Sequence, residues 1–128
     1  MVKIKIAKSV LVYWPIFERV LLSAVCFNAK PFIMNVIQIY APTSDSTDEE
    51  TNIFDEDLEK AIQACNSQEN IIIMGDFKAK VGSGDNSKSI GPHGLGDKND
   101  RGMILEAWCE ANEYVAMNTW FKNHKRRL

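Results

Sequence analysis

A carboxylate directly after a short apolar run is the feature of this sequence with the clearest chemical use. Asp76 stands in Gly75-Asp76-Phe77-Lys78, immediately after the apolar run at residues 71–74. A buried strand ending here would present the carboxylate at its tip, and glycine allows the backbone to approach a neighbour closely. The residues alone leave two interpretations open: a group that binds a metal or orients a water, or a turn-forming aspartate.

A phenol occupies a comparable place earlier in the chain. Tyr40 ends the apolar stretch at residues 32–40 and is followed by Ala41-Pro42-Thr43. At a strand tip its hydroxyl could form a hydrogen bond with a phosphate oxygen. Taken by itself, the residue is more simply an amphipathic tyrosine at a strand end.

Three strand-like runs, at residues 9–14, 19–27 and 32–40, make up the first part of the chain. The third has apolar residues at both alternating sets of positions, which is typical of a strand covered on both faces. We therefore expect a central strand that delivers Tyr40 to its tip.

A helix is expected next, because Ser46 and Glu49 have the spacing of a capping box. It should span residues 47–66, with an apolar face that recurs at helical spacing. That face consists of Phe54, Leu58, Ala61, Ile62 and Cys65. The β-branched run at residues 71–74 predicts a fully buried strand.

The last part of the chain predicts a long loop, a helix and a strand. The glycine-rich loop at residues 81–99 is either a contact for DNA or a plain flexible connection. Residues 100–112 predict a helix, and residues 114–119 predict a final strand. The helix is expected to bury Ile104, Leu105 and Trp108.

Length and composition limit the fold and the function. The 128 residues, 45% hydrophobic and 25% charged, suit one globular domain of the α/β (α+β) class, with sheets covered by helices. A net charge of −2 argues against a generally basic protein that coats nucleic acid. No apolar run is long enough to cross a membrane, so we expect an intracellular protein, nuclear or cytoplasmic.

The basic end of the chain is the best candidate for direct contact with phosphate. Lys125, Arg126 and Arg127 follow one another there, close to Lys122. Such a run can bind nucleic acid weakly through charge alone, or it can simply be solvated.

Four stretches together resemble the endonuclease/exonuclease/phosphatase superfamily. They are VIQIYAPTS at residues 36–44, IIMGDFKAKVG at 72–82, HGLGDKNDR at 93–101 and NTWFKNHKRRL at 118–128. Within that superfamily they are most similar to the endonuclease region of RTE-type (BovB-like) non-long-terminal-repeat retrotransposons. Their order and spacing agree with that region over nearly the whole chain.

The resemblance implies a four-layer α/β/β/α sandwich of the deoxyribonuclease I-like type. It also implies a Mg²⁺ site at the strand tips and phosphodiester hydrolysis by a metal-activated water. Tyr40 matches the family tyrosine near the scissile phosphate. Asp76 matches the aspartate that positions or deprotonates the nucleophile.

The sequence departs from the family pattern in two ways. Lys78 stands where the motif Gly-Asp-Phe/Trp-Asn has asparagine, so a group that donates and accepts is replaced by a cation that only donates. Its ammonium could pair with Asp76 and stabilise the charged carboxylate. In addition, the family's upstream metal-binding Glu and downstream Ser-Asp-His have no counterpart here, and Asp76 alone offers too few ligands for Mg²⁺.

The sequence therefore suggests residues 1–128 as a partial domain of a Mg²⁺-dependent endonuclease, of retrotransposon origin and inactive by itself. A domesticated, non-catalytic module that binds nucleic acid or protein is the main alternative. A nuclease completed by another chain is the third. DNA, a completing chain and a second copy are the partners to test, because unpaired strand edges favour self-association.

Overall fold

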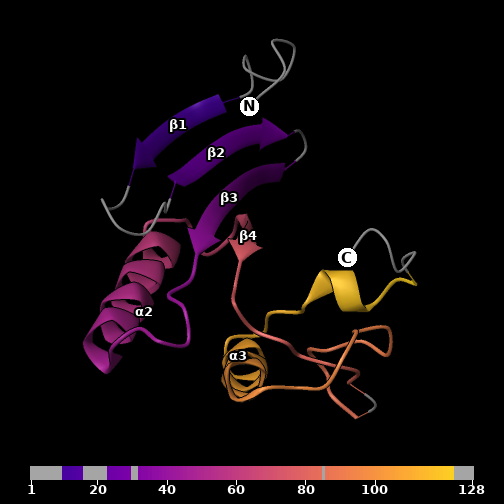
Figure 1. Cartoon of the computed structure of the whole chain (residues 1–128). Coiled ribbons are helices and arrows are strands. Elements are labelled where there is room, and N and C mark those ends of the chain that lie inside the picture. Colours follow the sequence, from indigo (N-terminus) through magenta and orange to yellow (C-terminus); the bar gives the residue numbers. More distant parts are fainter. Residues whose placement is uncertain (1–9, 16–22, 30–31, 85, 123–128) are drawn as a thin grey trace. The chain divides into compact units, whose positions relative to one another are not determined.

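The computed structural model describes residues 10–15, 23–29, 32–84 and 86–122, which form two compact units (Figure 1). Unit 1 is Met1–Lys78 and unit 2 is Ala79–Leu128. The elements of unit 1 are β1 (Val10–Pro15), β2 (Ser23–Ala29), β3 (Phe32–Tyr40), α2 (Asp48–Gln63) and β4 (Asn70–Asp76). Unit 2 contains α3 (Asp100–Ala111) and the short 3-10 helix η1 (Met117–Thr119). With helices and strands in this order, the protein is of the α/β class.

Unit 1 contains a four-stranded mixed sheet with the order β1-β2-β3-β4. β1 and β2 are antiparallel, β2 and β3 are antiparallel, and β3 and β4 are parallel. The parallel register runs from Met34 opposite Asn70 to Tyr40 opposite Asp76. The three early strands and the strand that precedes Asp76 are thus confirmed over the described residues, and β3 has the predicted bounds. Residue 9 and residues 19–22 of the predicted strands lie outside the described residues.

Helix α2 connects the two parallel strands and begins at a reciprocal cap. The hydroxyl of Thr47 accepts from the backbone N–H of Glu50 at 3.2 Å, and the Glu50 carboxylate accepts from the N–H of Thr47 at 3.3 Å. The capping box is therefore one residue later than the predicted Ser46 and Glu49. Satisfying these N–H groups fixes where the helix starts.

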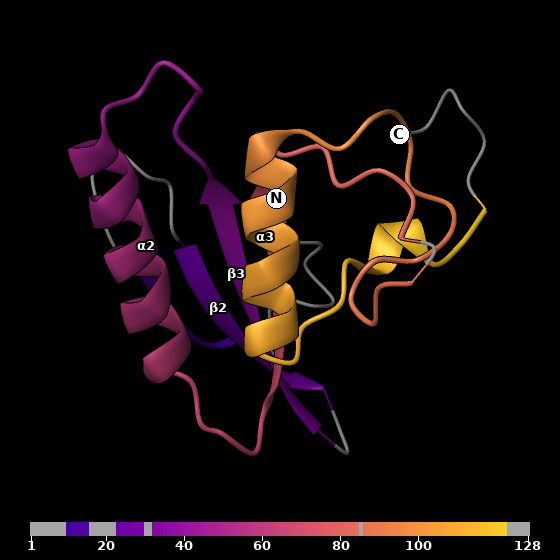
Figure 2. The same cartoon turned by 90° about the horizontal axis from the view of Figure 1, so that it is seen from below.

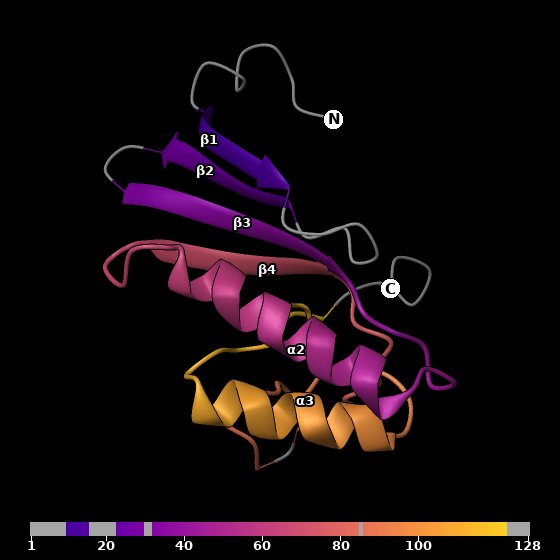
Figure 3. The ribbon, with the colours of Figure 1, turned by 90° about the vertical axis from the view of Figure 1, so that its left-hand side faces the viewer.

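The core of unit 1 lies between α2 and one face of the sheet (Figures 2 and 3). Ile37 and Ile39 of β3 are buried on that face, and α2 contributes Phe54, Leu58 and Ala61. Three of the five predicted apolar positions of the helix are therefore core residues. Ile62 and Cys65, the other two, are only partly buried.

On the opposite face of the sheet, side chains of β3 and β4 are exposed, which corrects two predictions. Gln38 and Tyr40 of β3 are exposed, so β3 is not covered on both faces. β4 is not a fully buried strand either, since Ile72 and Met74 are exposed. The strand order places β4 at the edge of the sheet. Helix α2 lies against one face of the sheet only (Figure 3).

In unit 2, hydrogen bonds organise the loop that precedes α3. The hydroxyl of Thr119 accepts from the N–H of Gly91 at 2.7 Å and donates to the carbonyl of Ala116 at 2.6 Å. Ile90 is fully buried and forms an isolated bridge with Ala116. The predicted strand at residues 114–119 is wrong, because these local bonds of Thr119 wind the chain into η1.

Helix α3 is confirmed, but the prediction that it buries Ile104 is wrong. Gly102 and Cys109 are its buried residues, and Ile104 is 68% exposed. A β-carbon on Gly102 would lie 1.8 Å from the carbonyl oxygen of Lys80, so the helix packs tightly against the loop there. Because of that contact, the side of α3 that carries Gly102 and Cys109 faces inward. Leu105 and Trp108 are partly buried.

Candidate functional site

The tips of β3 and β4 bring together the two residues that the sequence singles out. Tyr40 and Asp76 are register partners in the parallel pair, and the N–H of Ala41 donates to the carbonyl of Asp76 at 2.8 Å. In a parallel pair, residues directly opposite each other project from the same face of the sheet. The prediction that each side chain stands at a strand tip is therefore confirmed, and the structure adds that the two strands are neighbours.

Gly75 sets the close approach of the two strands just before Asp76. Its φ of +138° lies in a region that residues with a side chain rarely adopt. A β-carbon added here would lie 1.9 Å from the carbonyl oxygen of Ile39, which is the residue opposite it. Glycine is therefore required for the backbone path that carries the carboxylate.

Lys78 folds back onto the carboxylate of Asp76. Its backbone N–H donates to Oδ1 of Asp76 at 3.0 Å, and its ammonium forms an ion pair with Oδ2. The same ammonium lies 4.7 Å from the centroid of the Tyr40 ring, in a cation–π arrangement. The possibility that Lys78 pairs with Asp76 is thus confirmed, and Tyr40 joins the pair.

The electrostatics of this group follow from the ion pair. The hydrogen bond from the Lys78 ammonium, with a second from its backbone N–H, lowers the pKa of Asp76. The carboxylate of Asp76 in turn raises the pKa of Lys78, with a smaller contribution from Tyr40. The three side chains stay open to solvent, with Asp76 48% and Lys78 30% exposed.

A Lys78→Met chain should have a higher Asp76 pKa, because methionine removes the ammonium and keeps the backbone donor. Titration of the side-chain carboxyl carbons by NMR measures this change. Lys98→Met is a matched control, because Lys98 lowers the pKa of Glu106 in the same way. It should raise the pKa of Glu106 and leave Asp76 unchanged. If the Asp76 carboxyl has the same pKa in Lys78→Met as in the unchanged chain, the ion pair is contradicted.

The donor set around Asp76 does not fit a magnesium ion. Mg²⁺ requires several oxygen ligands at near-octahedral positions. Both carboxylate oxygens of Asp76 already accept from Lys78, and the ammonium places a like charge where a metal would bind. In the described ranges, no group of three or more His, Cys, Asp and Glu side chains could hold a metal ion.

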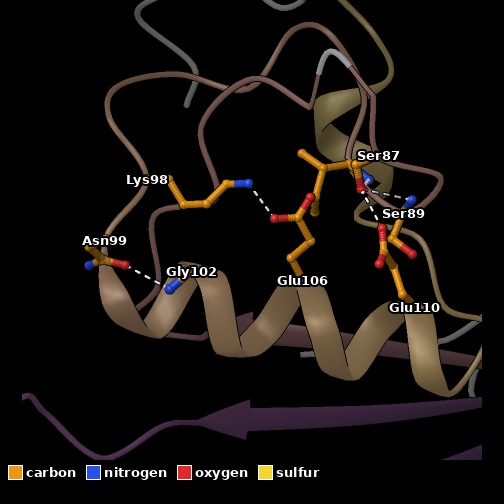
Figure 4. Close-up of polar contacts among 8 residues, drawn as sticks. Ser87, Ser89, Lys98, Asn99, Gly102, Glu106 and Glu110 are labelled. Carbon is orange, nitrogen blue, oxygen red and sulfur yellow. Dashed lines mark hydrogen bonds and ion pairs between the residues drawn. The ribbon is translucent and has the colours of Figure 1, made fainter.

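Unit 2 has a polar network of its own, which the sequence does not predict (Figure 4). Lys98 and Glu106 form an ion pair, and the hydroxyl of Ser87 donates to the carboxylate of Glu110 at 3.1 Å. These four side chains line an open cavity of about 420 Å³. Lys98 and Glu106 lie eight residues apart, outside the spacing of paired residues on one helix, so the sequence carries no signal for them.

Asn99 joins the start of α3 to the loop. Its side-chain oxygen accepts from the N–H of Gly102 at 2.8 Å and from the N–H of Lys80 at 3.0 Å. Asparagine before a helix is a common N-cap, so this role is readable from the sequence. Within the loop at residues 81–99, the N–H of Gly84 donates to the carbonyl of Gly91 at 3.1 Å, which argues against a plain flexible connection. Contact with DNA remains a prediction.

The basic end cannot be placed in this arrangement. Lys125, Arg126 and Arg127 lie outside the described residues. Lys122 is described and is exposed. Phosphate contact by this end of the chain therefore remains a prediction.

Two known proteins, both named craniofacial development protein 2, are similar to this chain. No protein-family model and no solved structure matches the chain. Craniofacial development protein 2 of Bos taurus is 39% identical over 105 residues, and that of Tragulus javanicus is 38% identical over 102 residues. The matches cover 82% and 80% of this chain but 18% of each relative. The chain is thus similar to craniofacial development protein 2 and spans about a fifth of its length.

Proposed function

We propose that the chain is an endonuclease-like module of retrotransposon origin that does not hydrolyse phosphodiesters by itself. The observation that carries the proposal is the ion pair between the Lys78 ammonium and the Asp76 carboxylate at the tips of β3 and β4. A carboxylate at that position supports the relationship to an endonuclease. The cation bound to it supports the loss of hydrolysis.

The pair opposes both tasks that a carboxylate would have in hydrolysis. A general base works best when its pKa lies near the operating pH, and Lys78 lowers the pKa of Asp76. A metal ligand must offer oxygen atoms to a cation, and the ammonium of Lys78 already takes one of them. The four-layer sandwich stays part of the proposal by resemblance, and the intracellular location stays part of it from the apolar pattern of the sequence. Mg²⁺ is the cofactor that the resemblance implies, and we propose that this chain does not bind it tightly. None of the helices in the described ranges is long and apolar enough to span a membrane.

Purified chain is expected to leave supercoiled plasmid intact in Mg²⁺ or Mn²⁺, because Asp76 is held by Lys78. Gel electrophoresis of the plasmid after incubation measures nicking directly. An Asp76→Ala chain is the matched control for a contaminating nuclease. Nicking by the unchanged chain that is lost in Asp76→Ala would refute the proposal and favour a working active site.

A further inference from the structure

The outer edge of β4 is unpaired among the described strands, and its own residues do not discourage pairing. β4 ends the sheet order, and no other described strand pairs with its outer side. Natural edge strands are usually blunted by lysine, proline or a bulge. From Asn70 to Gly75 the strand has no charged residue and no proline, and its register with β3 has no shift. It is therefore a ready template for another strand.

One hydrogen bond shows which backbone groups face that edge. The carbonyl of Asp76 accepts from the N–H of Ala41, so the backbone groups of Asp76 point toward β3. Along a strand, the N–H and C=O of one residue point to the same side, and those of the next residue point to the opposite side. The groups of Ile71, Ile73 and Gly75 consequently point outward. They offer donors and acceptors to a new partner strand.

We propose that this edge pairs with β4 of a second copy of the chain, antiparallel about a two-fold axis at Ile73. This register opposes Ile73 to itself and Ile71 to Gly75, so the outward backbone groups of both copies meet. It also uses the full length of the strand from Asn70 to Asp76. A two-fold axis closes the assembly at two copies, which limits further growth.

The side chains also favour the antiparallel arrangement. Asn70 of each copy lies opposite Asp76 of the other, so an amide donor meets a carboxylate. A parallel arrangement in the same register would place the two Asp76 carboxylates side by side, which is unfavourable. On the open face, Ile72 lies opposite Met74 of the second copy. These exposed apolar side chains, 42% and 51% exposed, would then shield each other.

Sedimentation velocity of the 128-residue chain over a concentration series tests the dimer. The decisive step compares variants that carry opposite charges at the edge of β4, each alone and then mixed. The unchanged chain should dimerise. Chains carrying Ile72→Lys with Met74→Lys, or Ile72→Glu with Met74→Glu, should each be monomeric, because like charges oppose each other across the edge. An equimolar mixture of the two should restore a dimer. Both sites are exposed, so circular dichroism should show a retained fold.

Two further variants test whether dimerisation uses the edge of β4 and not another surface. Ile53→Lys adds charge to an exposed position of α2 and should leave the dimer intact. Asn70→Asp places a carboxylate opposite Asp76 and should weaken dimerisation by about tenfold at two symmetric sites, without touching the core. An unchanged chain that is monomeric at every concentration would overturn the proposal. So would charged variants that still dimerise alone, or a mixture that stays monomeric.

Discussion

Gly75→Ala is expected to destabilise the protein by at least about 2 kcal/mol, from overpacking and backbone strain together. The new methyl group would lie 1.9 Å from the carbonyl oxygen of Ile39, and φ at this position is +138°. The obstacle is backbone and not a movable side chain. Relief would therefore require β3 and β4 to separate where they carry Tyr40 and Asp76. Urea denaturation followed by circular dichroism measures the change in free energy of unfolding.

Gly96→Ala separates the two causes of this loss. Gly96 has φ of +74° but no atom within 4 Å of an added β-carbon, so alanine there meets strain without a clash. Its cost should be about 1 kcal/mol, the usual penalty for a left-handed conformation. If Gly75→Ala costs no more than Gly96→Ala, the close approach to Ile39 is not present in solution.

The elements with strong local signals are predictable from the sequence. The apolar run of β3 and the apolar face of α2 each fall within one segment, and the positions of the two elements are confirmed. The predicted cap of α2 is wrong by one residue because Ser46 and Thr47 are both good N-cap residues. Local pattern identifies such a cap and does not choose between adjacent candidates.

The exposure of β4 is not predictable, because it depends on the order of strands in the sheet. A run of three isoleucines and a methionine is the usual pattern of a buried strand. Here the strand pairs on one side only, and α2 covers one face. In α3, similarly, apolar spacing points to Ile104, but contact with the loop turns the Gly102 face inward. Both errors concern packing between elements that are distant in the sequence.

The candidate site is predictable in its residues and only partly in its geometry. Strand ends place Asp76 and Tyr40, and the departure at Lys78 indicates a cation beside a carboxylate. The cation–π contact with Tyr40 and the φ of +52° at Lys78 require the structure. A positive φ favours asparagine several-fold over most side chains. This would give a backbone reason for the asparagine in the motif that this segment resembles.

Lys78→Asn is expected to raise DNA cleavage by about 10²–10³ in a chimera that supplies the remaining family segments from an active relative. Those segments carry the Glu and the Ser-Asp-His that the resemblance implies. The substitution removes the ammonium from Asp76, which frees its oxygen atoms, and restores a neutral amide beside the phosphate. Asparagine also suits the positive φ at this position. Single-turnover cleavage of a labelled duplex measures the rate.

Lys78→Ala in the same chimera distinguishes the two effects. Alanine removes the cation but supplies no amide, so a rate equal to that of Lys78→Asn would assign the gain to releasing Asp76 alone. An intermediate rate would divide the gain between releasing Asp76 and restoring the amide. DNA affinity, measured by fluorescence anisotropy at fixed salt, should change little, since one phosphate contact among several is altered. Equal cleavage by the chimera that keeps Lys78 and by the Lys78→Asn chimera would show that the ion pair with Asp76 opens readily on substrate, and that the lysine is no barrier to hydrolysis.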